Sequence, residues 1–325
     1  MAHFRRFTCI LVIGFCLVAN AFASDFNHSA QTGFRYGPNM AWTLSGNTPF
    51  VWGKWLPQAY GSLHYTWLEP LDLLTYGEKL GRTPSYWRMD AGVEITPFYG
   101  GYLAGIGIRP FKFNPQIELN MTYESYLYFK SNLEMVTADV EGAGRIVETW
   151  NADYITNNVY GDDAEFDYAQ LVDMSALISY SFPRGSVLGL SFHYILSDVS
   201  TGYNGKSYDY KRNIPVFSRD FLFEVENYGR VPLNENFALL YRTTYYRTGY
   251  LREGHTVQKE SLSYGKMLLG GHFSWKDGLQ NISVEVGAWN RFKERFYDGS
   301  LAQQFLFQVE YEGYFSFPFH RSYQE

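Results

Sequence analysis

Most of the chain alternates apolar and polar residues with a period of two. The pattern is clearest near the C-terminus, where Phe307, Val309 and Tyr311 share one phase. Gln308 and Glu310 occupy the other phase. Because successive side chains of a β-strand point to opposite faces, this alternation predicts extended strands, each with one apolar face.

The same alternation recurs in several segments, and their lengths are those that strands need to cross a membrane. The segments lie at 88–97, 116–129, 172–182, 188–196, 216–228, 236–249, 263–276, 280–292 and 304–317. Strands of soluble sandwiches average about five or six residues, whereas a tilted strand that crosses a membrane needs about nine to eleven. The segment lengths therefore favour strands whose apolar face contacts lipid.

The strand count follows from the spacing of these segments. Counting backward from the C-terminus gives ten strands that begin near Arg88, and residues 34–69 are expected to supply two more. The predicted fold is an all-β, antiparallel, up-and-down transmembrane β-barrel of about 12 strands. The alternative is ten strands, with an N-terminal segment in or under the barrel. Residues 69–86 are expected to form a long connection that contains a short helix.

The predicted connections alternate in length. Short turns are expected at 113–115, 183–185, 229–232 and 276–278, and long polar connections near 130–166, 198–215, 249–262 and 293–302. Tyr, Phe and Trp recur near the strand ends, where membrane barrels carry aromatic girdles. Short turns on the periplasmic side and long loops on the extracellular side are typical of outer-membrane barrels. A β-sandwich has no reason to keep this rhythm.

On these features the chain resembles the bacterial outer-membrane β-barrel class as a whole, over most of its length. The resemblance implies location in the bacterial outer membrane, contact with its lipids and lipopolysaccharide, and insertion by the barrel assembly machinery. Members of the class typically end in an aromatic residue that this machinery recognises. Here Phe315, Phe317 and Phe319 continue the apolar phase, and a short tail, 320–325, follows.

The first residues have the order of a secretory signal peptide. Arg5 and Arg6 precede an apolar run over 10–18, and small residues end in an A-x-A cleavage site at Ala23. We therefore expect residues 1–23 to be removed, which leaves residues 24–325 as a single barrel domain. An uncleaved or buried N-terminal helix is the alternative.

Composition excludes several other classes of protein. Both cysteines, Cys9 and Cys16, lie in the expected signal peptide, so the mature chain would have no disulfide. A hydrophobic content of 46% and an aromatic content of 19% exclude intrinsic disorder. A formal net charge of −6 offers no basic excess for phosphate backbones, so nucleic acid is not an expected partner.

The polar phase of the strands is expected to line the barrel interior. Its predicted lumen-lining charged residues are Arg88, Asp90, Glu94, Glu118, Glu124, Asp173, Asp220, Glu224, Glu226, Arg242, Lys266, Glu285, Arg291, Glu310 and Glu312. Acidic residues outnumber basic ones in this set, and rings of carboxylates favour cations in a water-filled pore. The alternative is a closed interior of Glu–Arg and Glu–Lys pairs that only holds the wall together.

Aromatic residues in the same phase are expected to fill space near the barrel ends. They are Tyr126, Tyr128, Tyr246, Trp289 and Tyr314. The alternative is a ladder of rings along which sugars or other flat solutes could slide.

The sequence contains two candidate catalytic pairs and one candidate cation site. His272 with Ser274 and Ser191 with His193 each place an imidazole and a hydroxyl on one strand face. Both pairs belong to the lumen phase, whereas a lipid hydrolase needs them near the membrane boundary. They are therefore expected to be ordinary lumen residues. The carboxylates of 162–167 could hold Ca²⁺ but are expected to be solvated. No cofactor or resident metal is expected.

These observations predict a narrow passive channel with a net-acidic, cation-preferring lumen, or a structural wall protein. Small solutes or cations would be its ligands. One alternative is an outer-membrane hydrolase that acts on lipid or lipopolysaccharide. The other is a secreted, aromatic-rich β-sandwich that binds glycans.

Overall fold

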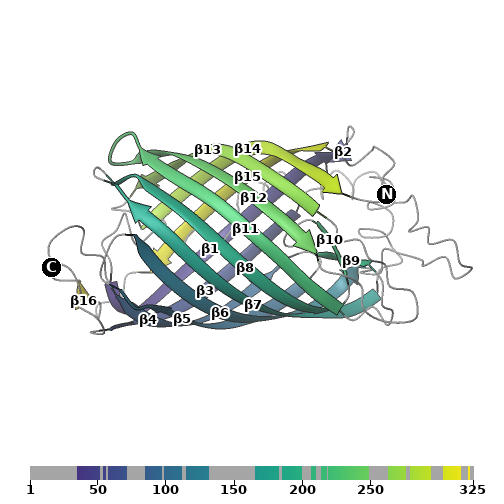
Figure 1. The fold of residues 1–325 in the computed structure, drawn as a ribbon, viewed down its shortest axis with the longest axis horizontal. Coiled ribbons are helices and arrows are strands. Elements are labelled where there is room, and N and C mark those ends of the chain that lie inside the picture. The colour runs from purple at the N-terminus through teal and green to yellow at the C-terminus, as the bar shows by residue number, and fades with distance from the viewer. Residues whose placement is uncertain are drawn as a thin grey trace, which may run out of the picture.

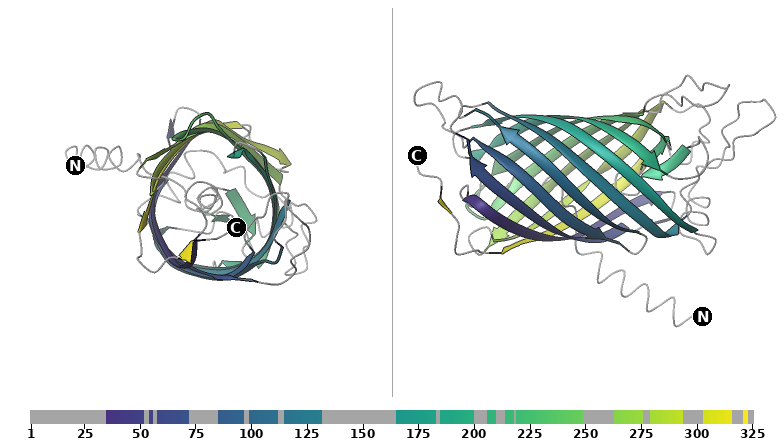
Figure 2. Two further views of the ribbon diagram at one scale, coloured as in Figure 1. Left: turned by 90° about the vertical axis from the view of Figure 1, so that its left-hand side faces the viewer. Right: turned by 90° about the horizontal axis from the view of Figure 1, so that it is seen from below.

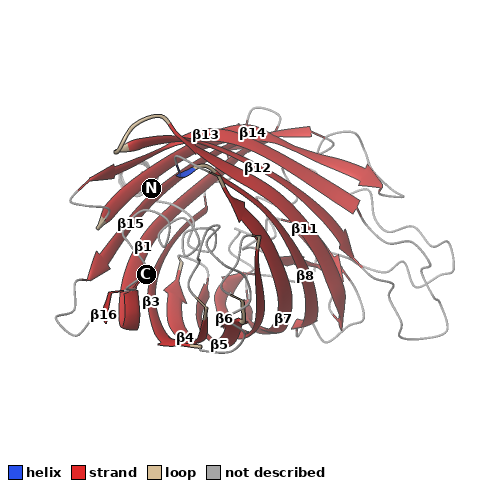
Figure 3. Cartoon of the chain, turned by 60° about the vertical axis from the view of Figure 1, so that its left-hand side comes forward, coloured by secondary structure: helices blue, strands red, loops and turns tan. Residues whose placement is uncertain are grey.

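The alternating segments form long tilted strands in the computed structural model (Figure 1). The structure describes residues 35–51, 54–55, 58–71, 85–96, 99–111, 115–131, 165–182, 185–199, 206–209, 214–217, 219–248, 263–275, 279–293, 303–315 and 321–322. Nearly all of these residues are in strands (Figure 3). Neither the expected signal peptide nor most of the 69–86 connection lies within the described residues.

Long strands build one large sheet. They are β1 (Arg35–Val51), β3 (Gln58–Pro70), β4 (Tyr86–Ile95), β5 (Tyr99–Arg109), β6 (Gln116–Ser131), β7 (Glu165–Ser181), β8 (Val187–Val199), β11 (Arg219–Pro232), β12 (Phe237–Thr248), β13 (Ser263–Trp275), β14 (Gln280–Lys293) and β15 (Gln303–Phe315). The short strands β2 (Lys54–Trp55) and β16 (Arg321–Ser322) pair with β1, and β9 (Lys206–Asp209) pairs with β10 (Ile214–Phe217).

The large sheet closes on itself. Each long strand pairs antiparallel with its neighbours in chain order, and β1 also pairs with β15, from Met40 opposite Phe315 to Phe50 opposite Phe305. The result is a closed barrel of 12 strands, seen end-on in Figure 2. The expectation of about 12 strands is confirmed, and the ten-strand alternative is wrong. The β-sandwich alternative is also wrong, because one closed sheet replaces two stacked ones.

The connections differ in length at the two ends of the barrel. At the end where β1 begins, which we call the short-turn end, the connections are 71–85, 110–115, 182–186, 233–236 and 276–279. At the opposite end, the long-connection end, they are 52–57, 96–98, 132–164, 200–218, 249–262 and 294–302. One predicted turn was misplaced: 229–232 belongs to β11, and the turn follows at 233–236. Two connections depart from the rhythm, 71–85 in being long and 96–98 in being short.

Large apolar side chains cover the outer face of the barrel. Met89, Val93 and Ile95 on β4 are between 46% and 65% exposed, while Glu94 between them is buried. The same alternation continues around the barrel, for example at Ile106 and Leu269. A continuous apolar belt of this kind is unfavourable in water and matches the hydrocarbon core of a bilayer. The outer face is therefore the lipid-facing surface.

Among the described residues, no helix has the length and apolar character needed to cross a membrane.

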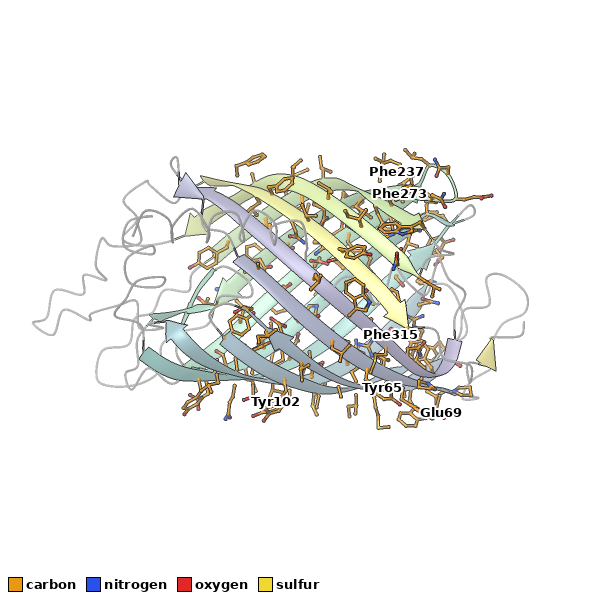
Figure 4. The ribbon with its side chains drawn as sticks, turned by 180° about the vertical axis from the view of Figure 1, so that it is seen from behind. Tyr65, Glu69, Tyr102, Phe237, Phe273 and Phe315 are labelled. Carbon is orange, nitrogen blue, oxygen red and sulfur yellow. The ribbon has the colours of Figure 1, made fainter. Side chains whose placement is uncertain are left out.

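Aromatic side chains gather on the outer face near the strand ends. At the short-turn end, a chain of ring contacts joins Phe273, Trp275, Tyr311 and Trp42, with centroid distances of 5.7, 5.7 and 5.0 Å. Figure 4 shows Phe237, Phe273 and Phe315 on the outside of this end, and Tyr102 nearer the other end. Near the long-connection end, the ring centroids of Tyr102 and Tyr123 are 6.2 Å apart. These rings occupy the positions of two interfacial girdles.

We predict that Leu269→Arg destabilises the barrel in a lipid bilayer. Leu269 is exposed on the outer face at the centre of β13, and an arginine at the bilayer midplane costs about 2–4 kcal/mol. Leu233→Arg, in the exposed turn after β11, is expected to cost about 0–1 kcal/mol. Urea-induced unfolding in vesicles measures both free energies. Equal losses would contradict a lipid-facing outer surface.

Candidate functional site

The strand register puts the candidate charged residues in one phase, opposite the exposed apolar residues. Six of them are buried: Glu94, Glu118, Glu124, Glu285, Glu310 and Glu312. Seven are partly exposed: Arg88, Asp90, Asp173, Glu224, Glu226, Arg242 and Lys266. Asp220 and Arg291 lie on β11 and β14, but their side chains are outside the described part of the structure. The described charged side chains form separate clusters in the interior.

The first cluster surrounds Glu118 near the short-turn end; we call it the Glu118 cluster. Arg109 Nη2 lies 2.7 Å from Glu118 Oε2, and the Tyr86 hydroxyl donates to the same oxygen at 2.8 Å. Arg88 Nη1 lies 3.3 Å from Glu118 Oε1, and Arg88 Nε lies 3.0 Å from Asp90. Both carboxylate oxygens of Glu118 are thus in contact with arginine, so the cluster is closed.

A glycine allows Arg88 to reach this carboxylate. Arg88 is on β4 and Glu118 on β6, and Gly107 on the intervening strand β5 pairs with Arg88 on one side and Asn120 on the other. A Cβ at Gly107 would lie 2.9 Å from Arg88 Nε and 2.2 Å from Asn120 Oδ1. Any side chain at position 107 would therefore displace the arginine that crosses the strand.

The second cluster surrounds Arg242; we call it the Arg242 cluster. Arg242 Nε lies 3.8 Å from Glu226 Oε2, and Arg242 Nη2 lies 3.7 Å from Glu285 Oε2. Each carboxylate also accepts a neutral hydrogen bond, Glu226 from Thr244 at 3.2 Å and Glu285 from Gln308 at 3.3 Å. Both ion pairs are longer than a hydrogen bond.

A glycine strand position also lies between Arg242 and Glu285. Arg242 is on β12 and Glu285 on β14, and Gly270 on β13 pairs with Glu285. A Cβ at Gly270 would lie 2.7 Å from Glu285 Cγ and 2.1 Å from the Val284 carbonyl oxygen. Both clusters join an arginine to a glutamate two strands away. Gly107 leaves space for the arginine, whereas Gly270 leaves space for the glutamate.

Tyrosines hold the carboxylates nearer the long-connection end. The Tyr99 hydroxyl donates to Glu94 at 2.5 Å, and the Tyr126 hydroxyl donates to Glu124. The two rings meet edge to face with centroids 5.1 Å apart. All four side chains are buried, so they fill the interior at this level.

The predicted inward aromatic residues also contact charged side chains in the interior. Tyr126 and Tyr246 are buried in the interior, and Lys266 Nζ lies 5.6 Å from the centre of the Tyr246 ring. The Tyr314 hydroxyl donates to Glu312. The side chains of Tyr128 and Trp289 are outside the described residues.

The structure brings together only one of the two candidate catalytic pairs. His272 Nε2 lies 2.9 Å from Ser274 Oγ, and its Nδ1 lies 2.9 Å from Ser283 Oγ. All three side chains are buried on the inward face, away from the lipid boundary. His193 instead places Nδ1 2.9 Å from Asp173 Oδ2 on the neighbouring strand.

Sequence reasoning missed several inward residues. Arg109 and Tyr86 complete the Glu118 cluster, and Arg230 is buried in the same phase on β11. The period-two phase of 99–109 would have pointed Arg109 inward together with Leu103. Apolar residues also face the interior and are buried in the half of the barrel nearer the long connections: Leu103, Leu171, Ile195, Leu222, Leu268 and Leu306. The inward face is therefore mixed rather than uniformly polar.

No group of three or more metal-ligating side chains is found among the described residues. The side chains of the candidate Ca²⁺ carboxylates at 162–167 lie outside that part of the chain.

Comparisons with known proteins give likenesses of fold. No protein family matches the chain, and no curated protein matches its sequence. The translocator domain of the autotransporter NalP from Neisseria meningitidis is 14% identical, with 90% of this chain and 92% of that chain covered and a TM-score of 0.39. An outer membrane channel from Pseudomonas putida F1 is 10% identical, with 88% and 98% covered and a TM-score of 0.44. OmpT, an outer membrane protein of Vibrio cholerae, is 7% identical, with 87% and 100% covered and a TM-score of 0.39.

The chain's own architecture defines its class. A closed antiparallel barrel with an apolar outer face and charged residues inside is a transmembrane β-barrel of the bacterial outer-membrane type.

We predict that Glu118→Ala strongly destabilises the barrel. The Glu118 and Arg109 side chains are each 3% exposed, so the substitution leaves a buried guanidinium without its carboxylate. Breaking a buried pair in this way costs about 3–5 kcal/mol. Asp173→Asn, in the more exposed pair with His193, is expected to cost about 0–1 kcal/mol. Urea-induced unfolding compares the two, and a small loss for Glu118→Ala would contradict a closed structural cluster.

Proposed function

We propose that this protein is a narrow passive channel of the bacterial outer membrane whose interior prefers cations. One observation carries the proposal: carboxylates outnumber basic side chains on the inward face. The described acids are Asp90, Glu94, Glu118, Glu124, Asp173, Glu224, Glu226, Glu285, Glu310 and Glu312. The described bases are Arg88, Arg109, Arg230, Arg242 and Lys266. An acidic lining lowers the energy of a cation in transit and raises that of an anion.

Partial exposure of the central charges supports a hydrated path. The side chains of Asp173, Arg242 and Glu226 are between 14% and 16% exposed, and that of His193 is 26% exposed. An isolated carboxylate sealed in a dry interior would be protonated rather than charged, so charged groups that retain contact with water favour a wet lumen. The closed Glu118 cluster narrows the path near the short-turn end.

Location and partners follow from the barrel type. We propose that the apolar belt contacts outer-membrane lipids and the long-connection end contacts lipopolysaccharide. We further propose that the barrel assembly machinery inserts the chain after removal of residues 1–23.

Reconstitution in a planar bilayer tests the channel and its charge preference. We expect discrete conductance steps, and a reversal potential in a KCl gradient that reports a preference for K⁺ over Cl⁻. Asp173→Asn combined with Glu224→Gln removes two partly exposed inward carboxylates and is expected to shift the permeability ratio toward unity while conductance persists. Folded protein that conducts no current would overturn the channel and favour a structural wall protein.

The second candidate function, an outer-membrane hydrolase, rests on the 2.9 Å contact between His272 and Ser274. Because both side chains are buried inside the barrel, we predict no hydrolysis of phospholipid or lipopolysaccharide above background. A fluorogenic phospholipid assay of the wild type and Ser274→Ala checks this. Hydrolysis by the wild type that Ser274→Ala abolishes would favour the enzyme over the channel as the function of the protein.

A further inference from the structure

The Glu118 and Arg242 clusters each pair an arginine with a glutamate two strands away, but their ion pairs differ in length. In the Glu118 cluster, the carboxylate oxygens lie 2.7 and 3.3 Å from arginine nitrogens. In the Arg242 cluster, the nearest carboxylate oxygens lie 3.7 and 3.8 Å from the guanidinium. The ion pairs of the Arg242 cluster are therefore the longer of the two sets.

Two buried atoms of the Arg242 cluster have no hydrogen-bond partner. They are Nε of Arg242, a donor, and Oε1 of Glu285, an acceptor. The Glu285 side chain is only 3% exposed, so bulk water does not readily satisfy it. Buried charged groups without partners are unfavourable, and each one needs a physical explanation such as an ordered water or a bound ion.

The site opens toward the interior space. The Arg242 and Glu226 side chains are 14% and 16% exposed, while Glu285 lies deeper. Lys266 lies within electrostatic range of Arg242, Glu226 and Glu285. A solute moving along the barrel would therefore meet positively charged hydrogen-bond donors beside negatively charged acceptors.

We propose that the Arg242 cluster binds small zwitterionic solutes of the α-amino-acid type. The proposal rests on the proposed channel function and specifies one class of solute for it. The solute carboxylate would accept hydrogen bonds from the Arg242 guanidinium, whose planar fork suits carboxylates. The solute ammonium would donate to Glu285 Oε1 and to Glu226.

The mixture of charges selects this class over simpler ions. A lone anion at Arg242 would face Glu226 and Glu285, and a lone cation at Glu285 would face Arg242 and Lys266. A neutral sugar could reach the same atoms, but it lacks the charge on both sides that makes such hydrogen bonds strong. A zwitterion carries one charged group for the arginine and another for the carboxylates.

Equilibrium dialysis of radiolabelled glycine against the full-length folded protein in detergent, at pH 7, tests the proposal without requiring conduction. We expect saturable binding in the millimolar range that unlabelled glycine competes away. Equal concentrations of acetate, ethylammonium or glucose are expected to leave it intact. Displacement by glucose, or by acetate alone, would overturn the zwitterion assignment. Absence of saturable binding would overturn the site, with water then filling it.

Substitutions locate the binding. Glu285→Gln is expected to weaken glycine binding about tenfold, and Asp173→Asn, a lumen carboxylate outside the cluster, to change it by less than about twofold. Heat-modifiable gel migration confirms that each variant is folded. If Glu285→Gln does not fold, Glu226→Gln and Arg242→Lys make the same test from the more exposed side. Unchanged binding in a folded cluster variant, or an equal loss in Asp173→Asn, would overturn the assignment.

The test is independent of the proposed function. Glycine binding without single-channel conductance would leave the site in place and remove the channel. Conductance without glycine binding would remove the site and leave the channel.

Discussion

The structure depends on the need to pair every backbone amide and carbonyl in a medium without water. A sheet in lipid cannot leave an edge exposed, since each unpaired group costs several kcal/mol. The pairing of β1 with β15 removes the edge that this chain would otherwise have. Closure also fixes the orientation of the side chains, because alternate residues of each strand must then face lipid or the enclosed interior.

Enclosure sets the chemistry of the interior. Charged residues that cannot reach bulk water must pair within the barrel, and neighbouring strands alone do not always offer a partner. Gly107 leaves space for Arg88 to cross a strand and meet Glu118, and Gly270 leaves space for Glu285 beside its strand. Where tyrosine and a second arginine join, as around Glu118, the pair becomes part of the wall. Around Arg242 the ion pairs are longer, and the Arg242 and Glu226 side chains keep some exposure to the interior.

The sequence predicted the fold well because lipid imposes a strict period on the chain. Almost any membrane strand must alternate outward apolar residues, such as Met89 and Val93, with inward polar residues, such as Arg88 and Asp90. Interior contacts were less predictable. Leu222 follows Phe221, and both are apolar although they face opposite sides, so apolar character alone does not reveal an inward leucine. The partners of Arg88 and Arg242 depend on strands far apart in sequence, and the role of the intervening glycines appears only when the register is known.

Lipid contact of the outer face can be measured by a site-directed spin-label scan of 88–94 in residues 24–325 folded in vesicles. The two native cysteines lie in the expected signal peptide, so labels would report only introduced positions. Accessibility to lipid-dissolved oxygen is expected to rise and fall with a period of two, with maxima at Met89, Ala91 and Val93. Maxima at Arg88, Asp90 and Gly92, or no alternation at all, would contradict lipid contact of the outer face.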